Sequence, residues 1–155
     1  MKLSDIIVTD AIIPDLGSAT RDEAIEQLIK SLAQANAIPK RAIEEATTAV
    51  INRENHATTG IGKGVALPHA KLKSIKHPVG TIGRSSRGID FSSLDSKPVY
   101  IIILLLSCVE NPDEHLQAME TIFNHVQQDI FRKFLLQCDT VEKIADLISE
   151  ADELR

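Results

Sequence analysis

The segment from Val99 to Leu106 constrains the fold more than any other part of the sequence. It is an unbroken run of eight apolar residues between Pro98 and Ser107. An apolar run of this length without alternation is typical of a strand that is covered on both faces. The sequence therefore predicts a central strand at 99–106, in a sheet with helices on both sides.

Helical periodicity predicts two helices before that run. Thr20 and Glu23 have capping-box spacing, and apolar residues then recur at helical intervals to about Asn36. Pro39 is predicted to be the first residue of a second helix, which continues to about Arg53.

A third helix is predicted after the central strand. Asn111 followed by Pro112 and Glu114 is typical of a helix start, and the apolar stripe continues to Val126. The remaining elements are short strands at 65–67 and 79–85 and helices at 130–136 and 141–148. Helices and strands around one buried strand predict a single α/β domain over residues 1–155, a three-layer α/β/α arrangement with a mixed, mostly buried sheet flanked by helices.

Composition argues against several classes of protein. The net charge of −5 does not suit a nucleic-acid binder, which needs excess Lys and Arg. No apolar run approaches the roughly 20 residues that span a bilayer, and Met1 leads into mixed sequence rather than a signal-peptide core. We therefore expect a cytoplasmic protein without direct membrane insertion. Cys108 and Cys138 stand alone and are expected to be small buried apolar residues, not a disulfide or metal site.

The charge is unevenly distributed along the chain. The stretch from Arg53 to Arg87 holds seven Lys or Arg residues and one acid, a net +6, so the rest of the chain carries −11 of the total of −5. A local positive field in an acidic protein suits a small anion such as a phosphoryl group. A solvated basic face would give the same pattern, and charge alone does not separate the two.

His69 lies within this basic stretch, directly after Pro68. The fixed backbone angle of proline limits the movement of the histidine, as a positioned nucleophile requires. A neutral imidazole is nucleophilic near neutral pH and also a good leaving group, so a phosphoryl group attached to it stays activated for onward transfer. His69 is thus a candidate phosphoryl acceptor.

A glycine-rich segment just before His69 could stabilise the charge of that group. Backbone N–H groups between Thr59 and Gly64 are candidate phosphoryl ligands, and Arg53 is the candidate cation. The predicted phosphoryl-binding residues are Thr59, Gly60, Gly62 and Gly64. A nucleotide-binding P-loop is disfavoured because Ala57 and Gly64 stand where that motif needs Gly and Ser or Thr.

The other histidines are open to more than one interpretation. A metal site is disfavoured because there is no HExxH motif, and His115 and His125, ten residues apart on one helix, would point about 80° apart. His115 lies at a predicted helix start, where it could donate a hydrogen bond to a phosphoryl oxygen or could simply be exposed. His56, His77 and His125 are expected at the surface or in packing roles.

The segment from Thr59 to His69, TGIGKGVALPH, together with Arg53-Glu54 before it, resembles the phosphorylation-site signature of enzyme IIA domains of the mannitol/fructose/nitrogen class. These domains belong to the bacterial phosphoenolpyruvate-dependent phosphotransferase system. The resemblance continues through GIDF at 88–91 and His115-Leu116, so it covers nearly the whole chain. Two departures are Leu67, where Ile is common, and residues 107–111, which replace a more usual segment containing Pro.

The resemblance implies that His69 accepts a phosphoryl group from the phosphohistidine of the carrier protein HPr, on Nε2, and that His115 and Arg53 support it. No cofactor is implied. The partner that receives the group would be a sugar-transporting IIB domain or a regulated target protein. A chain without a fused IIB segment favours the regulatory, nitrogen-type role. A docking module that has lost the transfer chemistry is an alternative of another class, against which His69, His115 and Arg53 argue.

Overall fold

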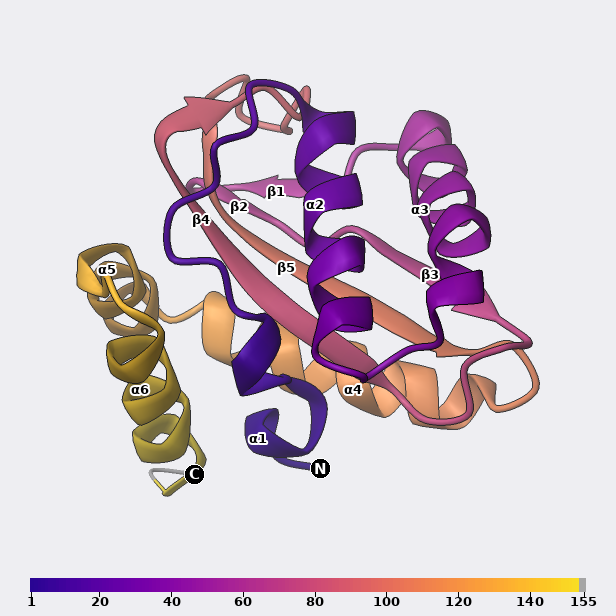
Figure 1. Cartoon of the computed structure of the whole chain (residues 1–155). Coiled ribbons are helices and arrows are strands. Elements are labelled where there is room, and N and C mark those ends of the chain that lie inside the picture. Colours follow the sequence, from indigo (N-terminus) through magenta and orange to yellow (C-terminus); the bar gives the residue numbers. More distant parts are fainter. Residues whose placement is uncertain (154–155) are drawn as a thin grey trace.

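A five-stranded mixed sheet forms the centre of the computed structural model, which describes residues 1–153 (Figure 1). Strand β5 (Val99–Cys108) is its axis. Strands β2 (Val65–Ala66) and β3 (His69–Leu72) pair in parallel with successive parts of β5, while β4 (Val79–Ile89) is antiparallel to it. Strand β1 (Gly60–Gly62) is antiparallel to β2 at the edge of the sheet.

The apolar side chains of β5 alternate between two cores. Ile102, Leu104 and Leu106 belong to one buried cluster, whereas Ile103 and Leu105 belong to the other. This alternation is the period of two that a strand imposes on its side chains. The prediction of a central strand covered on both faces is confirmed.

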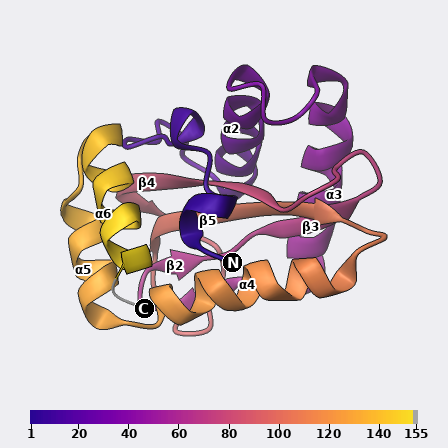
Figure 2. The ribbon, with the colours of Figure 1, turned by 90° about the horizontal axis from the view of Figure 1, so that it is seen from below.

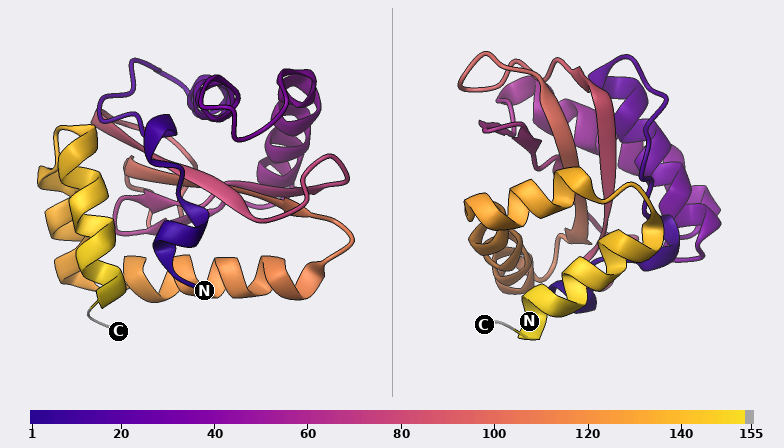
Figure 3. Two further views of the ribbon diagram at one scale, coloured as in Figure 1. Left: turned by 60° about the horizontal axis from the view of Figure 1, so that its bottom comes forward. Right: turned by 90° about the vertical axis from the view of Figure 1, so that its left-hand side faces the viewer.

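Helices cover both faces of the sheet (Figure 2). Helices α2 (Arg21–Gln34) and α3 (Ile43–His56) pack on one face. Helix α4 (Pro112–Val126) packs on the other, together with α1 (Leu3–Ile6), α5 (Asp129–Gln137) and α6 (Val141–Glu153). Two views in Figure 3 show these layers from the side, and they confirm the predicted three-layer α/β/α arrangement.

The helix starts show where local sequence decided the structure. Thr20 caps α2 by accepting a hydrogen bond from Glu23 N, as predicted. Asn111 caps α4 in the same way through Glu114 N, and Pro112 is the first residue of that helix. The prediction for Pro39 is wrong: it lies in extended backbone and a short 3₁₀ turn, Lys40–Ala42, precedes α3.

Several short elements were not predicted. They are α1, the 3₁₀ turn Thr9–Ala11, β1 and β3, all shorter than five residues. Segments of this length carry too few residues for a periodic pattern, and β3 follows directly after Pro68. The other elements differ from prediction in their ends: α6 continues to Glu153 rather than ending at Ile148, and β4 continues to Ile89 past a register shift after Arg84.

No helix within residues 1–153 is long and apolar enough to cross a membrane. Cys108 and Cys138 are both free thiols, and each is partly buried rather than fully buried as expected. Burial raises the pKa of the Cys138 thiol.

Candidate functional site

His69 is the first residue of β3 and lies beside Leu105 of β5. Its ring Nδ1 lies 2.8 Å from the backbone oxygen of Leu67. Because a carbonyl oxygen can only accept, Nδ1 carries the ring proton and donates it. The other nitrogen, Nε2, makes no hydrogen bond to residues 1–153 and keeps its lone pair. The hydrogen bond to Leu67 O therefore leaves Nε2 as the ring nitrogen of His69 that can act as a nucleophile.

The charge state of His69 is set mainly by burial, which lowers its pKa. The hydrogen bond to Leu67 opposes this effect, while the positive charge of Arg53 adds to it. Glu54 raises the pKa again and Lys71 lowers it, both more weakly. With its pKa below the ordinary value of 6.5, the imidazole is neutral at neutral pH and can act as a nucleophile.

His115 comes to the same place from the first turns of α4. Its ring centroid lies 5.5 Å from that of His69, with the two ring planes tilted by 42°. The side chain is buried, and burial, followed by the charges of His69 and Lys71, lowers its pKa to about 4. His115 is thus not an exposed helix-start residue, and it is neutral at pH 7. The structure brings together two neutral imidazoles that are 46 residues apart in the sequence.

The pairing of β3 with β5 explains why these groups share one face. His69 lies opposite Leu105 and Lys71 lies opposite Ser107, so alternate residues of both strands point toward α4. Ser107 is fully buried there, and its Oγ lies 2.8 Å from His115 Nδ1. Neither Lys71 nor Ser107 was identified from the sequence. The spacing of His69 and Lys71 on a strand would have indicated a shared face, had β3 been recognised.

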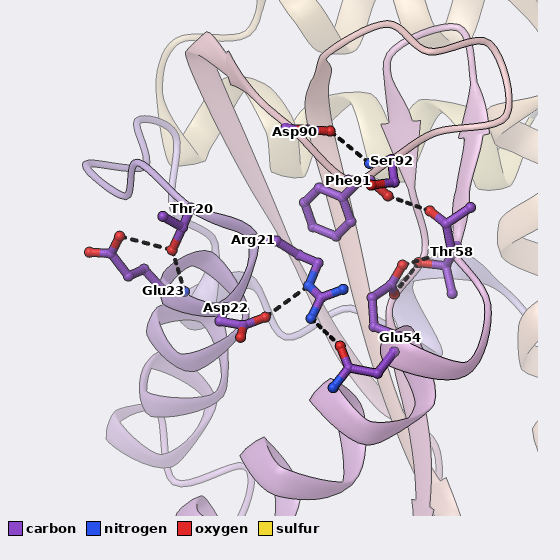
Figure 4. A network of polar contacts seen from close by, with 11 residues as sticks. Thr20, Arg21, Asp22, Glu23, Glu54, Thr58, Asp90, Phe91 and Ser92 are labelled. Atoms are coloured by element: carbon purple, nitrogen blue, oxygen red, sulfur yellow. Dashed lines mark hydrogen bonds and ion pairs between the residues drawn. The ribbon is translucent and has the colours of Figure 1, made fainter.

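Arg53 and Glu54 lie in the last turn of α3, close to this site. Arg53 Nη1 donates a hydrogen bond to the backbone oxygen of Ala57 at 2.8 Å. The buried carboxylate of Glu54 accepts hydrogen bonds from both N and Oγ1 of Thr59, each 2.6 Å long. Figure 4 shows Glu54 facing the segment that leaves α3, where Thr58 Oγ1 also donates to Phe91 O. The carboxylate of Glu54 holds the connection between α3 and β1 in place.

This connection leads to His69 through the backbone. Thr59 O accepts a hydrogen bond from Leu67 N at 3.2 Å, and Leu67 O accepts the one from His69 Nδ1. Glu54 therefore acts on the orientation of His69 through Thr59 and Leu67. Sequence reasoning gave Glu54 no role of its own, because a lone acid in a basic stretch carries no motif.

The four predicted phosphoryl-binding residues lie in and beside the hairpin of β1 and β2, and the N–H groups of two of them donate to side chains. Thr59 N donates to Glu54, and Gly60 N donates to Thr58 Oγ1 at 3.0 Å. Gly62 and Gly64 flank the turn, where Gly64 O accepts from Tyr100 N and Ile101 N. His69 is aligned with Leu105, four residues farther along β5 from Ile101, or roughly 13 Å at strand spacing. The structure does not bring Gly62 and Gly64 to the histidines.

The remaining histidines are dispersed. His56 lies on the surface with Nδ1 2.7 Å from Asn52 O, and the exposed His77 lies 3.5 Å from Glu114. His125 is buried at the far end of α4, where Nδ1 lies 2.9 Å from Thr121 O. Over residues 1–153 there is no group of three or more His, Cys, Asp or Glu side chains that could hold a metal ion.

An α/β/α domain in which a neutral imidazole of β3 lies beside one of α4 suits a protein that carries a reactive group on histidine. A family model described as "Phosphoenolpyruvate-dependent sugar phosphotransferase system, EIIA 2" matches residues 5–151. The chain belongs to this family. Phosphotransfer within that system is therefore its class of activity.

Relatives carry names of two kinds. A nitrogen regulatory protein of Bradyrhizobium diazoefficiens is 34% identical over 134 residues, which is 86% of each chain. A fructose-specific EIIA component of Haloferax volcanii is 30% identical over 97% of each chain. A fructose-specific EIIABC component of Bacillus subtilis is also 30% identical, over 99% of this chain, but this chain spans only 24% of that protein.

Solved structures of the same kind share the fold. The nitrogen regulatory protein IIA-Ntr of Neisseria meningitidis has a TM-score of 0.82 and 23% identity, covering 94% of this chain and 98% of its own. The mannitol enzyme IIA of Escherichia coli, in a complex with its phosphorylated enzyme IIB, has a TM-score of 0.75 and 18% identity, covering 93% and 97%.

Proposed function

We propose that this chain is a phosphoryl carrier in which His69 Nε2 accepts the phosphoryl group, with phosphorylated HPr as the donor. The observation that carries the proposal is the 2.8 Å hydrogen bond from His69 Nδ1 to Leu67 O, which leaves Nε2 as the nucleophilic nitrogen. The lowered pKa of this histidine keeps that lone pair available near neutral pH.

The transfer exchanges one N–P bond for another. The lone pair of His69 Nε2 forms a bond to phosphorus while the N–P bond of the donor breaks, and its electron pair returns to the donor imidazole. His69 keeps its Nδ1 proton, so the phosphorylated ring is positively charged and remains hydrogen-bonded to Leu67 O. In the onward step the N–P bond breaks again, and neutral His69 is a good leaving group.

Arg53 and His115 have supporting roles in this proposal. The guanidinium of Arg53 is close enough to His69 to lower its pKa, so it can also stabilise the negative charge of a phosphoryl group there. In the same proposal His115, whose ring lies 5.5 Å from that of His69, donates a hydrogen bond to a phosphoryl oxygen. The proposal gives Gly62 and Gly64 no part in binding the group.

The test is to incubate the protein with phosphoenolpyruvate, enzyme I and HPr, and to measure intact mass and acid lability. We expect one acid-labile phosphoryl group on the wild type and none on folded His69→Ala. His56→Ala, which removes an exposed histidine at the end of α3, is the matched control and should be labelled like the wild type. Labelling of His69→Ala would disprove the proposal, as would an unlabelled wild type beside phosphorylated HPr.

We further propose a regulatory, nitrogen-type role, with delivery to a sugar-transporting IIB domain as the second candidate. The relative at 34% identity and the structure with a TM-score of 0.82 both carry nitrogen regulatory names, whereas other relatives are fructose-specific. Phosphorylated protein that passes its group rapidly to a purified fructose-type IIB domain would favour the transport role. Stable phosphorylated protein in the same mixture would favour regulation.

A further inference from the structure

Ser107 is a fully buried polar residue whose hydroxyl contacts the site but has no role in the function proposed above. It lies near the end of β5 and points toward α4, and its Oγ lies 2.8 Å from His115 Nδ1. Within residues 1–153, this is the only hydrogen bond of either side chain. The two groups must therefore satisfy each other, or remain partly unsatisfied in a buried position.

The direction of this hydrogen bond decides which nitrogen of His115 carries the proton. A neutral imidazole has one N–H, so Nδ1 either donates to Ser107 Oγ or accepts from it. If Nδ1 donated, the hydroxyl proton of Ser107 would have no acceptor among residues 1–153, and an unpaired buried donor is unfavourable. If the hydroxyl donates, its proton is satisfied and His115 carries its own proton on Nε2.

We propose that Ser107 is a positioning residue that donates its hydroxyl proton to His115 Nδ1 and thereby fixes His115 as the Nε2–H tautomer. His69 is held by Leu67 O as the opposite tautomer, with its proton on Nδ1. The site then contains one imidazole whose Nε2 has a lone pair for phosphorus and another whose Nε2 has a proton for a phosphoryl oxygen. This inference rests on the proposed function for its purpose, but the tautomers can be measured without it.

The two histidines have the same ring but carry their proton on different nitrogens, because the partner of His69 is a carbonyl oxygen and the partner of His115 is a hydroxyl. A carbonyl oxygen can only accept, whereas a hydroxyl can donate, so exchanging the two partners would exchange the two roles. A second Nε2 lone pair in place of the Nε2–H would repel the oxygens of an incoming phosphoryl group. Ser107 prevents this arrangement.

The experiment is a long-range ¹H–¹⁵N correlation spectrum of the unphosphorylated full chain labelled with [¹⁵N]histidine, recorded at pH 7.5. In the wild type we expect the Nδ1–H tautomer at His69 and the Nε2–H tautomer at His115. An Nδ1–H tautomer at His115 would overturn the proposal whatever any variant does. Because this measurement uses the wild type, it does not depend on whether a variant folds.

Variants then test whether Ser107 is the cause. In Ser107→Ala we expect the Nε2–H preference of His115 to be lost while His69 is unchanged, and phosphorylation to slow roughly three- to tenfold, as for one neutral hydrogen bond. Ser107→Thr keeps the hydroxyl and should restore both the Nε2–H tautomer of His115 and the rate of phosphorylation. Ser85→Ala, the same change at a buried serine of β4, should alter neither.

The outcomes separate this inference from the proposed function. If Ser107→Ala is folded and keeps both the His115 tautomer and the wild-type rate, Ser107 does not position His115 and the inference is wrong. If both tautomers are as expected but the wild type is never phosphorylated, the tautomer assignment stands and the carrier function is disproved.

Discussion

Two regions of this chain, the glycine hairpin of residues 60–64 and the pair of His69 and His115, differ in what their polar groups bind. In the hairpin, the N–H groups of Gly60 and Lys63 donate to side chains of the protein itself. In the histidine pair, both Nδ1 atoms have protein partners and both Nε2 atoms have none among residues 1–153. The hairpin therefore uses its N–H groups to shape the edge of the sheet, whereas the two Nε2 atoms stay open to the external group of the function proposed above.

The first way to test this contrast is to remove the cation beside the histidines. We expect Arg53→Ala to slow phosphoryl transfer by roughly ten- to a hundredfold, because a charged hydrogen bond to the transferring group is worth about 1.5–3 kcal/mol. Rapid-quench kinetics with phosphorylated HPr would measure the rate. Arg41→Ala, at an exposed arginine in the 3₁₀ turn before α3, is the control. An unchanged rate in Arg53→Ala would remove Arg53 from the site.

The second test removes one imidazole of the pair. We expect His115→Ala to slow transfer by about tenfold, since it loses one hydrogen bond to a charged group, while His69 remains a target for labelling. The end point of labelling by intact mass, recorded beside the initial rate, separates slow transfer from no transfer. Complete loss of labelling in a folded His115→Ala would recast His115 as essential.

The third test alters the hairpin. A Cβ on Gly60 would lie 2.2 Å from Ser93 Oγ and 3.0 Å from Ser93 Cα, so the backbone must shift to accommodate it. We expect Gly60→Ala to lower the free energy of unfolding by about 1–3 kcal/mol, measured by urea denaturation. Gly17→Ala is the matched control, because a Cβ there meets no atom within 4 Å.

The transfer rate of the same hairpin variant tests whether the hairpin also binds the phosphoryl group. If the hairpin is structural, folded Gly60→Ala should keep a transfer rate within about threefold of the wild type, less than the loss of a single hydrogen bond to a charged group. A folded variant that transfers as slowly as Arg53→Ala would instead mean that the hairpin contributes directly to phosphoryl binding.

The last prediction concerns how the stability of the protein depends on pH. The pKa of His115 is lowered to about 4 from an ordinary value of 6.5, and that of His69 is also lowered, both mainly by burial. Between these values the unfolded chain binds more protons, so the free energy of unfolding should fall as the pH decreases from 6.5 toward about 4. An NMR titration that gave His115 a midpoint near 6.5 would contradict its burial in the site.

The parts of the fold that the sequence predicted are those with a long periodic or apolar signal. The apolar run at 99–106 identified β5, and the capping residues Thr20 and Asn111 identified the starts of α2 and α4. Strand β3 was missed because its four residues alternate between polar and apolar for too short a distance, directly after a proline. The length of such a strand is decided by its pairing with β5, which local sequence does not contain.

The site was predictable where a residue's chemistry and its local motif coincided. His69 and Arg53 stood out because they lie in a basic stretch beside glycines, and the structure places both at one site. Ser107 could not be recognised, since its importance depends on the register that brings it under His115. The role of Gly62 and Gly64 stays a prediction, because glycine suits both a hairpin turn and a phosphate-binding loop; both residues, with positive φ angles of 96° and 79°, lie at the turn between β1 and β2.

The contact between the first and last helices has a consequence for how such a domain can be combined with others. Asp152 near the end of α6 accepts hydrogen bonds from the backbone nitrogens of Leu3 and Ser4, at 2.8 and 3.1 Å. A unit whose two ends meet can be inserted into a longer polypeptide, or have its ends joined and reopened elsewhere, without disturbing its interior. The Bacillus subtilis relative, in which the matching region is about a quarter of the whole, is consistent with such modular use.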